Sequence, residues 1–327
     1  MNRRVLITGG TGFVGSHAVE AFAATGWEVR ALVRDPSRIG WRRGVRVEVV
    51  RGALTDRDSL AEAVRECDLV IHCAGLTKAL READYHRVNA TAVGEFATLA
   101  REAGVKRFVL CSSQAAAGPS RMASAAIEDD EPNPISAYGR SKLAGERRLC
   151  AAAGEMEWII LRPPGIMGPR DEQFVPLFRA VVRYGIYPRF GRGGQRYGFV
   201  SVHDVVRALV VAGEASSGVN ETYFVCNDEP VAWEDASRII AECANRRARA
   251  VRLPRALLHV AGAVADSWAW MRGKPALLSG DKIREILAPG WICSPAKIRR
   301  AWSFACEWSL DATIRDTYES YRAERRL

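Results

Sequence analysis

The chain opens with an apolar run that leads into a glycine-rich turn, VLITGGTGFVG at residues 5–15. The run predicts a buried strand, and the residues after the turn predict a helix that ends at Gly26. Gly9, Gly12 and Gly15 recur at steps of three, as a tight turn, the close approach of a pyrophosphate and close helix–sheet packing require. We therefore expect a dinucleotide at the start of this helix. The residues expected to contact it here are Thr8, Gly9, Gly12, Phe13, Val14 and Gly15.

Strand-like and helix-like segments alternate from this turn to about residue 165. Such alternation predicts an α/β fold with a parallel, doubly wound sheet. The expected strands cover residues 5–8, 28–34, 45–51, 69–73, 108–112 and 158–162. The expected helices in this half cover residues 14–25, 58–67, 85–103 and 137–153.

Beyond residue 165 the alternation becomes less regular. Residues 168–198 are rich in Gly, Pro and Arg and are interpreted as an insertion. Strand-like residues return at 199–202 and 222–226, and helical patterns cover 204–214, 233–244 and 254–271. We predict a dinucleotide-binding domain of residues 1–165, completed by about 199–228. A smaller, mainly helical lobe of residues 166–198 and 229–327 is predicted to bind the substrate.

The composition is that of an ordinary globular protein. The 327 residues are 48% hydrophobic and 26% charged, and no apolar run approaches the ~20 residues that span a bilayer. The eight cysteines form no C-x-x-C pair, which favours reduced thiols in a cytoplasmic protein. The five histidines lack metal-ligand spacing, so no metal site is expected. The net charge of +9 is interpreted as general solubility, and no nucleic-acid partner is expected.

A second local pattern, Y-x-x-x-K, places Lys142 four residues after Tyr138. Positions i and i+4 share one face of a helix, so the ammonium of Lys142 is expected beside the phenol. A nearby positive charge favours the phenolate and lowers the tyrosine pKa from ~10, which suits proton transfer at neutral pH. A dinucleotide site together with a proton-transfer group predicts a redox enzyme.

The end of the second strand bears on the choice of dinucleotide. An acid there binds the ribose 2′-hydroxyl of NAD, whereas an arginine accepts the 2′-phosphate of NADP. Position 33 is valine and Arg34 follows it, which favours NADP(H). A shift of one residue would bring Asp35 to the ribose, and this leaves NAD(H) open as the alternative.

On these residues the chain resembles the extended short-chain dehydrogenase/reductase family over nearly its whole length. Similar segments are the glycine turn, IHCAG at 71–75, the helix with Asn89, the Arg162-Pro163 step and VHDV at 202–205. The run of residues 29–36 is especially similar to the dihydroflavonol reductase and 3β-hydroxysteroid dehydrogenase branches. Two segments depart from the family. Residues 52–54 are GAL where the family has an acid, and residues 163–164 are Pro-Pro where nucleotide-sugar epimerases often carry Asn.

The resemblance implies a Rossmann fold and a catalytic set of Ser113, Tyr138 and Lys142. Ser113 would hydrogen-bond the substrate oxygen, Tyr138 would transfer the proton, and Lys142 would also hold the nicotinamide ribose. A homodimer through the helices that carry Asn89 and Tyr138 is implied as well. Further cofactor contacts are implied for Leu54, Ala74, Gly75, Asn89, Tyr138, Lys142 and Pro163.

Two regions bear on the substrate. Gln114 follows Ser113, and the polar loop of residues 191–196 supplies Arg192 and Arg196; all three are candidate substrate contacts. Residues 246–271 combine an arginine-rich lead-in with an amphipathic helix. That helix would pack on the protein's own core or lie peripherally at the inner face of a membrane. A hydrophobic substrate would suit the tryptophans of this part of the chain, Trp268, Trp270, Trp291, Trp302 and Trp308.

The sequence thus predicts an NADP(H)-dependent oxidoreductase that reduces a keto group, or oxidises the alcohol, on a hydrophobic lipid- or steroid-like substrate. Two alternatives remain open at this point. One is a nucleotide-sugar epimerase or dehydratase that uses bound NAD, which Arg34 and Pro163-Pro164 disfavour. The other is a non-catalytic NADP-binding sensor, which the complete set of Ser113, Tyr138 and Lys142 disfavours.

Overall fold

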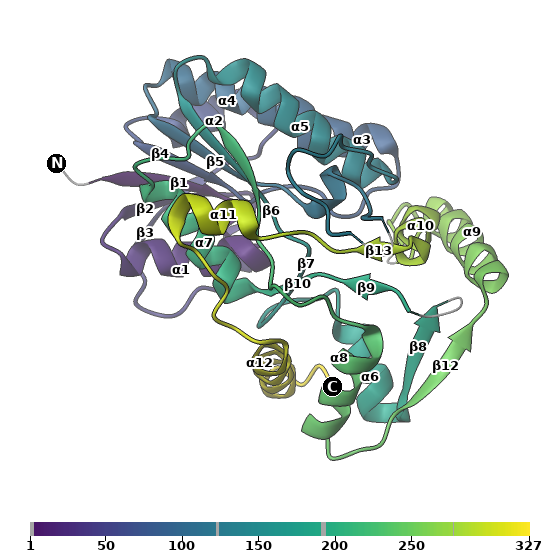
Figure 1. The fold of residues 1–327 in the computed structure, drawn as a ribbon. Helices are drawn as coiled ribbons and strands as arrows, with labels where there is room; N and C mark the ends of the chain where they lie inside the picture. The colour runs from purple at the N-terminus through teal and green to yellow at the C-terminus, as the bar shows by residue number, and fades with distance from the viewer. Residues whose placement is uncertain (1–2, 122–123, 191–193, 277) are drawn as a thin grey trace.

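The computed structural model describes residues 3–121, 124–190, 194–276 and 278–327 (Figure 1). Its centre is a seven-stranded sheet of order β11-β6-β5-β4-β1-β2-β3. Every pair of neighbouring strands in it is parallel, which confirms the predicted doubly wound α/β fold. The strands are β1 (Arg4–Thr8), β2 (Glu28–Val33), β3 (Val47–Arg51), β4 (Leu69–His72), β5 (Arg107–Cys111), β6 (Glu157–Arg162) and β11 (Glu221–Phe224).

Helices cover both faces of this sheet, because alternate side chains of its strands point to opposite sides. Val5 and Ile7 pack into the cluster formed with α1 (Phe13–Ala24) and α7 (Val202–Glu214). Leu6 packs into the opposite cluster, formed with three other helices. These are α2 (Arg57–Val64), α4 (Ala92–Glu102) and α5 (Ala137–Ala153).

The predicted helix at residues 85–103 is interrupted by a π-helical turn. The chain passes from α3 (Glu82–His86) through η2 (Arg87–Thr91) into α4, with Asn89 inside the π turn. Single π turns often occur where a helix carries a functional side chain. Two short 3-10 helices, η1 (Pro36–Arg38) and η3 (Gln114–Ala116), follow β2 and β5.

The remaining chain builds a smaller, mainly helical lobe, at the lower right of Figure 1. Its helices are α6 (Val175–Tyr184), α8 (Trp233–Cys243), α9 (Arg255–Arg272), α10 (Gly280–Leu287) and α12 (Leu310–Ala323). The core of the lobe joins α6, α8 and α12 through side chains such as Phe178, Ile240 and Tyr321. Its two-stranded ladders pair β7 (Gly165–Met167) with β10 (Phe199–Ser201), β8 (Ile186–Phe190) with β12 (Arg249–Leu253), and β9 (Arg196–Tyr197) with β13 (Gly290–Trp291).

Two details of the second half differ from the sequence-based expectation. The segment interpreted as an insertion contains α6 and β8, and Gly185 ends α6 with a φ of 63°. The strand expected at residues 199–202 does not join the central sheet, because β10 pairs with β7. In addition, α11 (Ala296–Trp302) returns from the lobe to the sheet and buries Ile298 in its core. The division into a domain and a lobe stays a prediction.

The predicted homodimer also stays a prediction. None of the large, exposed hydrophobic side chains of the described residues lies on α4 or α5.

None of the described helices is both long enough and apolar enough to cross a membrane.

Candidate active site

The glycine turn between β1 and α1 forms a cradle of close backbone contacts. Gly9 has a φ of 76°, and a Cβ there would lie 2.7 Å from the Ala74 nitrogen. A Cβ on Gly15 would lie 2.2 Å from the Gly9 oxygen, so only glycine fits at position 15 in the first turn of the helix. A Cβ on Gly12 would approach only that same oxygen, at 3.2 Å, among the described atoms. Gly12 is thus open on its outer side, where a ligand can approach.

The first turn of α1 is free to bind an anion. Gly12 is its N-cap, no side chain of the described residues caps it, and its first turn contains no acid. Unpaired amides and the positive end of the helix dipole then favour a negatively charged group. The cradle therefore fits the pyrophosphate of a dinucleotide.

At the end of β2 a cavity of about 310 Å³ is lined by Thr11, Arg34, Asp35 and Arg38. The Asp35 carboxylate is already engaged, because it accepts hydrogen bonds from the backbone nitrogen of Ser37 at 3.1 Å and its hydroxyl at 2.7 Å. These bonds hold the pKa of Asp35 below its usual value. Two guanidinium groups facing one cavity fit a phosphate better than a ribose hydroxyl.

Arg38 was missed in the sequence. It reaches this cavity because Asp35 caps the short helix η1, with Pro36 at its first position. The Asp-Pro-Ser pattern of residues 35–37 is the available signal, since it predicts a tight turn that reverses the chain.

Other predicted cofactor residues lie along the carboxyl ends of the strands. Ala74 and Gly75 follow β4, and Leu54 follows β3. The Asn89 side chain orders the loop after β4, since it accepts a hydrogen bond from the Leu76 nitrogen at 2.8 Å and donates one to the Leu76 oxygen at 2.9 Å. It also donates to the Ser141 hydroxyl at 3.0 Å, which ties this loop to α5. Pro163 is buried after β6, where its oxygen accepts from the Gln114 nitrogen at 2.8 Å.

The structure brings the three predicted catalytic residues together. Ser113 follows β5 and its side chain accepts a hydrogen bond from the Ala115 nitrogen at 3.1 Å. Tyr138 lies in the first turn of α5, close enough to Ser113 for that side chain to lower its pKa. Lys142, one turn further along α5, donates from Nζ to the Cys111 oxygen at 2.8 Å. Ser113 and the first turns of α5, which carry Tyr138 and Lys142, therefore lie together at the carboxyl end of β5.

A glycine explains why α5 can start so close to Ser113. A Cβ on Gly139 would lie 2.3 Å from the Ala115 oxygen, so only glycine permits this approach. Ser136 caps the helix here by accepting a hydrogen bond from the Gly139 nitrogen at 3.0 Å. The glycine inside the Tyr138–Lys142 pattern thus positions the tyrosine.

The electrostatics of Tyr138 differ from the sequence-based expectation. Burial raises the pKa of Tyr138 well above its usual value, and the interaction with Ser113 offsets only part of that effect. Burial also lowers the pKa of Lys142. The predicted lowering of the Tyr138 pKa is therefore wrong for the chain alone. The spacing of Tyr138 and Lys142 indicates that the two residues are close, but it does not show how strongly burial removes water from the phenol. The phenol stays protonated at neutral pH and is suited to donating a proton.

Behind the site lies a buried ion pair that the sequence did not reveal. Arg162 Nη2 lies 2.6 Å from Glu146 Oε2, and their side chains are only 6% and 4% exposed. The Ser112 hydroxyl also donates to the Glu146 carboxylate. This group joins β5, β6 and α5 directly behind Ser113 and Lys142.

The predicted substrate contacts have different surroundings. Gln114 is buried, and its Nε2 has no hydrogen-bond partner among the described residues, so a donor beside Ser113 is unsatisfied. Arg196 lies in β9 and pairs loosely with Asp235 at 3.9 Å. Arg192 lies outside the described residues.

Three of the tryptophans linked to a hydrophobic substrate instead have packing roles. Trp291 donates to the Glu285 oxygen at 2.7 Å, and Trp302 donates to the Ser217 oxygen at 3.0 Å. Trp308 stacks on His203 with ring centroids 4.4 Å apart. Trp268 and Trp270 lie on α9 and are exposed. The abundance of tryptophan in this part of the chain therefore does not indicate an apolar substrate.

Comparisons with known proteins agree with this fold. A model of the NAD dependent epimerase/dehydratase family matches residues 5–226. A ceramide reductase of Caulobacter vibrioides is 34% identical over 98% of this chain and 94% of its own. A 4-hydroxy-2-methyl-3-oxo-4-farnesyl-3,4-dihydroquinoline-1-oxide ketoreductase of Stigmatella aurantiaca is 28% identical over 87% of this chain and 91% of its own. The solved structure of MoeE5 with UDP-glucuronic acid and NAD superposes with a TM-score of 0.79 at 25% identity, covering 98% of this chain and 99% of that one.

Proposed function

Because the chain belongs to the NAD dependent epimerase/dehydratase family and is an NAD(P)-dependent oxidoreductase of the extended short-chain dehydrogenase/reductase type, we propose that it reduces a keto group on a lipid-like substrate with NADPH. One observation carries the choice of substrate class. It is the 34% identity, over nearly the full length of both chains, with a protein named ceramide reductase. The relative named as a ketoreductase of a farnesyl-bearing compound supports the same class.

The chain's own residues account for the proton side of this reaction. The Ser113 hydroxyl donates a hydrogen bond to the carbonyl oxygen of the substrate and holds it against Tyr138. As negative charge develops on that oxygen, Tyr138 donates its phenolic proton to it, and the alcohol forms. Burial keeps the pKa of Tyr138 high, so the proton is present at neutral pH. The dinucleotide, when bound, supplies the hydride that the carbonyl carbon receives.

The cofactor-binding residues hold the dinucleotide in two places. The glycine cradle and the open first turn of α1 bind its pyrophosphate. Arg34 and Arg38 bind the 2′-phosphate in the cavity that they line. Lys142 remains the proposed partner of the nicotinamide ribose, and its ammonium would stabilise the phenolate left on Tyr138.

The function is tested with the purified full chain and two sets of substrates. NADPH oxidation is followed by absorbance with a 3-keto ceramide in detergent micelles. UDP-glucose and UDP-glucuronic acid are incubated in parallel with NAD, and their products are separated by chromatography. We expect ketone-dependent NADPH oxidation and unchanged sugars. Interconversion of the sugars without ketone reduction would favour a nucleotide-sugar epimerase, a class worth testing because the MoeE5 structure holds UDP-glucuronic acid and NAD.

The cofactor preference gives a separate prediction. Arg38→Ala should weaken NADPH binding roughly tenfold to a hundredfold, because it removes one charge-assisted contact worth about 1.5–3 kcal/mol. NADH binding should change little, since NADH lacks the 2′-phosphate. Fluorescence titration of both dinucleotides measures the two affinities. Arg43→Ala, an exposed arginine of the following loop, is the matched control. Equal losses for NADPH and NADH would contradict the proposed role of Arg38.

A further inference from the structure

Helix α9 lies at the outer edge of the lobe beside α10 (Figure 1). Among its described residues only Leu258, Gly262 and Ala269 are buried. A Cβ on Gly262 would lie 2.6 Å from the Ile283 side chain, so α10 packs closely along this narrow strip. The rest of the circumference of α9 faces outward. The sequence left open whether the apolar stripe of this helix packs on the protein's own core, and the structure leaves most of that stripe exposed.

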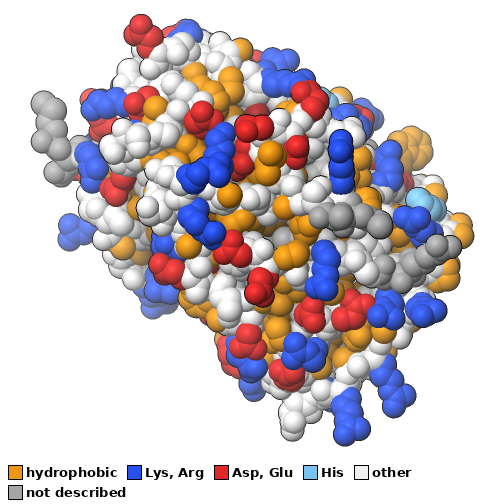
Figure 2. Space-filling model, in the orientation of Figure 1, with side chains coloured by type: hydrophobic (Ala, Val, Ile, Leu, Met, Phe, Trp, Pro, Cys, Tyr) orange, Lys and Arg blue, Asp and Glu red, His pale blue; other side chains and the backbone are white. Residues whose placement is uncertain are grey.

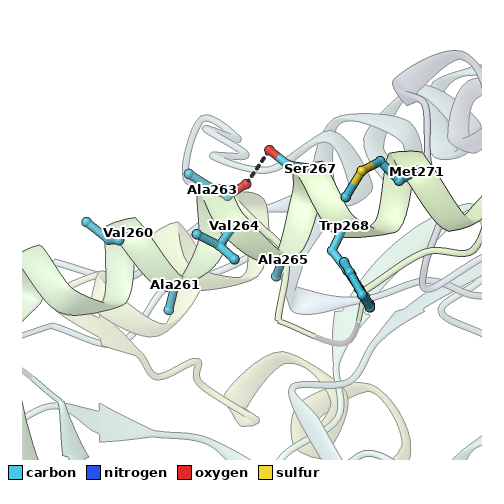
Figure 3. A pocket seen from close by; sticks show the side chains of 8 residues that line it. All are labelled: Val260, Ala261, Ala263, Val264, Ala265, Ser267, Trp268 and Met271. Carbon is cyan, nitrogen blue, oxygen red and sulfur yellow. Dashed lines mark hydrogen bonds between the residues drawn. The ribbon is translucent and has the colours of Figure 1, made fainter.

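The outward side of α9 is apolar. Val264 is 63% exposed, Trp270 76% and Met271 67%, and Leu257, Val260 and Trp268 are also exposed. The residues that line this open surface all come from α9 (Figure 3). Ser267 carries the one polar side chain among the described residues that line it, and its hydroxyl donates to the Ala263 oxygen at 2.9 Å. Apart from the indole nitrogen of Trp268, this surface therefore offers a partner few hydrogen-bonding side-chain groups.

Positively charged residues precede and follow this apolar surface along the chain. Figure 2 shows blue side chains beside orange ones at the right-hand edge, where Figure 1 draws α9 and β12. Residues 246–274 contain one acid, Asp266, and its carboxylate accepts a hydrogen bond from the Gly280 nitrogen at 2.9 Å. The basic residues of 246–274 are Arg246, Arg247, Arg249, Arg252, Arg255, Arg272 and Lys274.

Most of these charges have no ion-pair partner in the part of the chain that the structure describes. Arg246, Arg247, Arg249 and Arg252 form no ion pair within the described part of the chain. Arg272 lies over the Trp268 ring, 4.3 Å from its centroid, and so joins the charged border to the apolar face. An exposed apolar helix with tryptophans and uncompensated arginines is complementary to a bilayer surface that carries anionic headgroups.

We propose that α9 and its arginine-rich lead-in, residues 246–274, dock the protein on an anionic lipid bilayer, with α9 lying in the plane of the headgroups. The apolar side chains enter the boundary between headgroups and acyl chains, and the arginines bind lipid phosphates. A second copy of the chain is the competing occupant. A two-fold interface would place the same surface on itself, so unpaired arginines would face arginines. The proposal goes beyond ketone reduction and does not rest on it.

Flotation of the full chain with lipid vesicles tests the proposal. Wild-type protein should float with vesicles of phosphatidylglycerol and phosphatidylcholine, and far less with phosphatidylcholine alone. Val264→Glu, which places a carboxylate in the apolar face, should lower binding at least about tenfold. Arg247→Gln combined with Arg252→Gln should lower it roughly thirtyfold on anionic vesicles. High salt should weaken wild-type binding as well.

Matched controls keep the charge change and move it elsewhere. Val49→Glu alters an exposed valine of β3, which Figure 1 draws at the side of the molecule opposite α9. Arg43→Gln with Arg46→Gln removes two exposed arginines far from this surface. Both controls should bind vesicles like wild type. The proposal fails if wild type stays in solution with anionic vesicles, or if Val264→Glu floats like Val49→Glu. It also fails if sedimentation shows a dimer that Val264→Glu dissociates.

Discussion

Replacing Tyr138 with phenylalanine is expected to lower kcat for ketone reduction by about 10³-fold, within the range for loss of a positioned proton donor. The variant keeps the aromatic ring, which packs edge-on against Tyr85 at 6.2 Å, so the first turn of α5 should be preserved. Only the phenolic hydroxyl and its interaction with Ser113 are lost. Because Tyr138 is half-buried, solvent should replace the lost donor poorly.

The measurement is steady-state NADPH oxidation with a saturating lipid ketone, together with NADPH titration of the same variant. The fall should appear in kcat, and the NADPH affinity should stay within a few-fold of wild type. Tyr223→Phe is the control, since it removes a buried hydroxyl that donates to the Gly218 oxygen at 2.8 Å, in β11. If Tyr138→Phe retained wild-type kcat, the proton would have to come from another group, and a non-catalytic role for the site would be revived.

Local patterns predicted the parts of the site that depend on short spacing. The turn at Gly9, Gly12 and Gly15 and the pair Tyr138 and Lys142 lie within one or two turns of chain. Their geometry follows from the strand–turn–helix unit or from the pitch of one helix. For this reason the sheet and the cradle could be anticipated from local patterns, whereas the meeting of Ser113 with Tyr138 was implied only by the family resemblance.

What the sequence missed depends on contacts between distant segments or on burial. Glu146 and Arg162 pair from α5 and β6, and no local spacing reports that contact. Arg38 needs the reversal at η1 before it faces Arg34. The pKa of Tyr138 is set first by desolvation, which appears only when the surrounding elements are in place. In residues 168–198, the high content of Gly, Pro and Arg hid α6, whose apolar side chains are buried in the cluster that they form with α8 and α12.

The buried pair of Glu146 and Arg162 leads to the second large effect. Glu146→Ala should lower the free energy of unfolding by about 3–5 kcal/mol, because it leaves the Arg162 charge buried without its partner. Arg162 is 5% exposed and directs both Nε and Nη2 at this carboxylate. The Ser112 hydroxyl also loses its acceptor. Urea unfolding followed by circular dichroism measures the loss, and Glu319→Ala, in the exposed pair with Arg322, should change stability little.

A variant that removes both charges distinguishes two contributions to the free energy of unfolding: the penalty for a buried charge without a partner, and the stabilisation that the ion pair itself provides. Glu146→Leu combined with Arg162→Met should recover much of the stability lost in Glu146→Ala, since neither buried charge remains. The double variant should still reduce ketones poorly if the pair also positions β5 and α5, because Ser112 precedes Ser113 and Glu146 lies one turn after Lys142 on α5. An unfolding free energy for Glu146→Ala equal to that of Glu319→Ala would mean that Arg162 reaches water, and the proposed support behind the catalytic residues would be wrong.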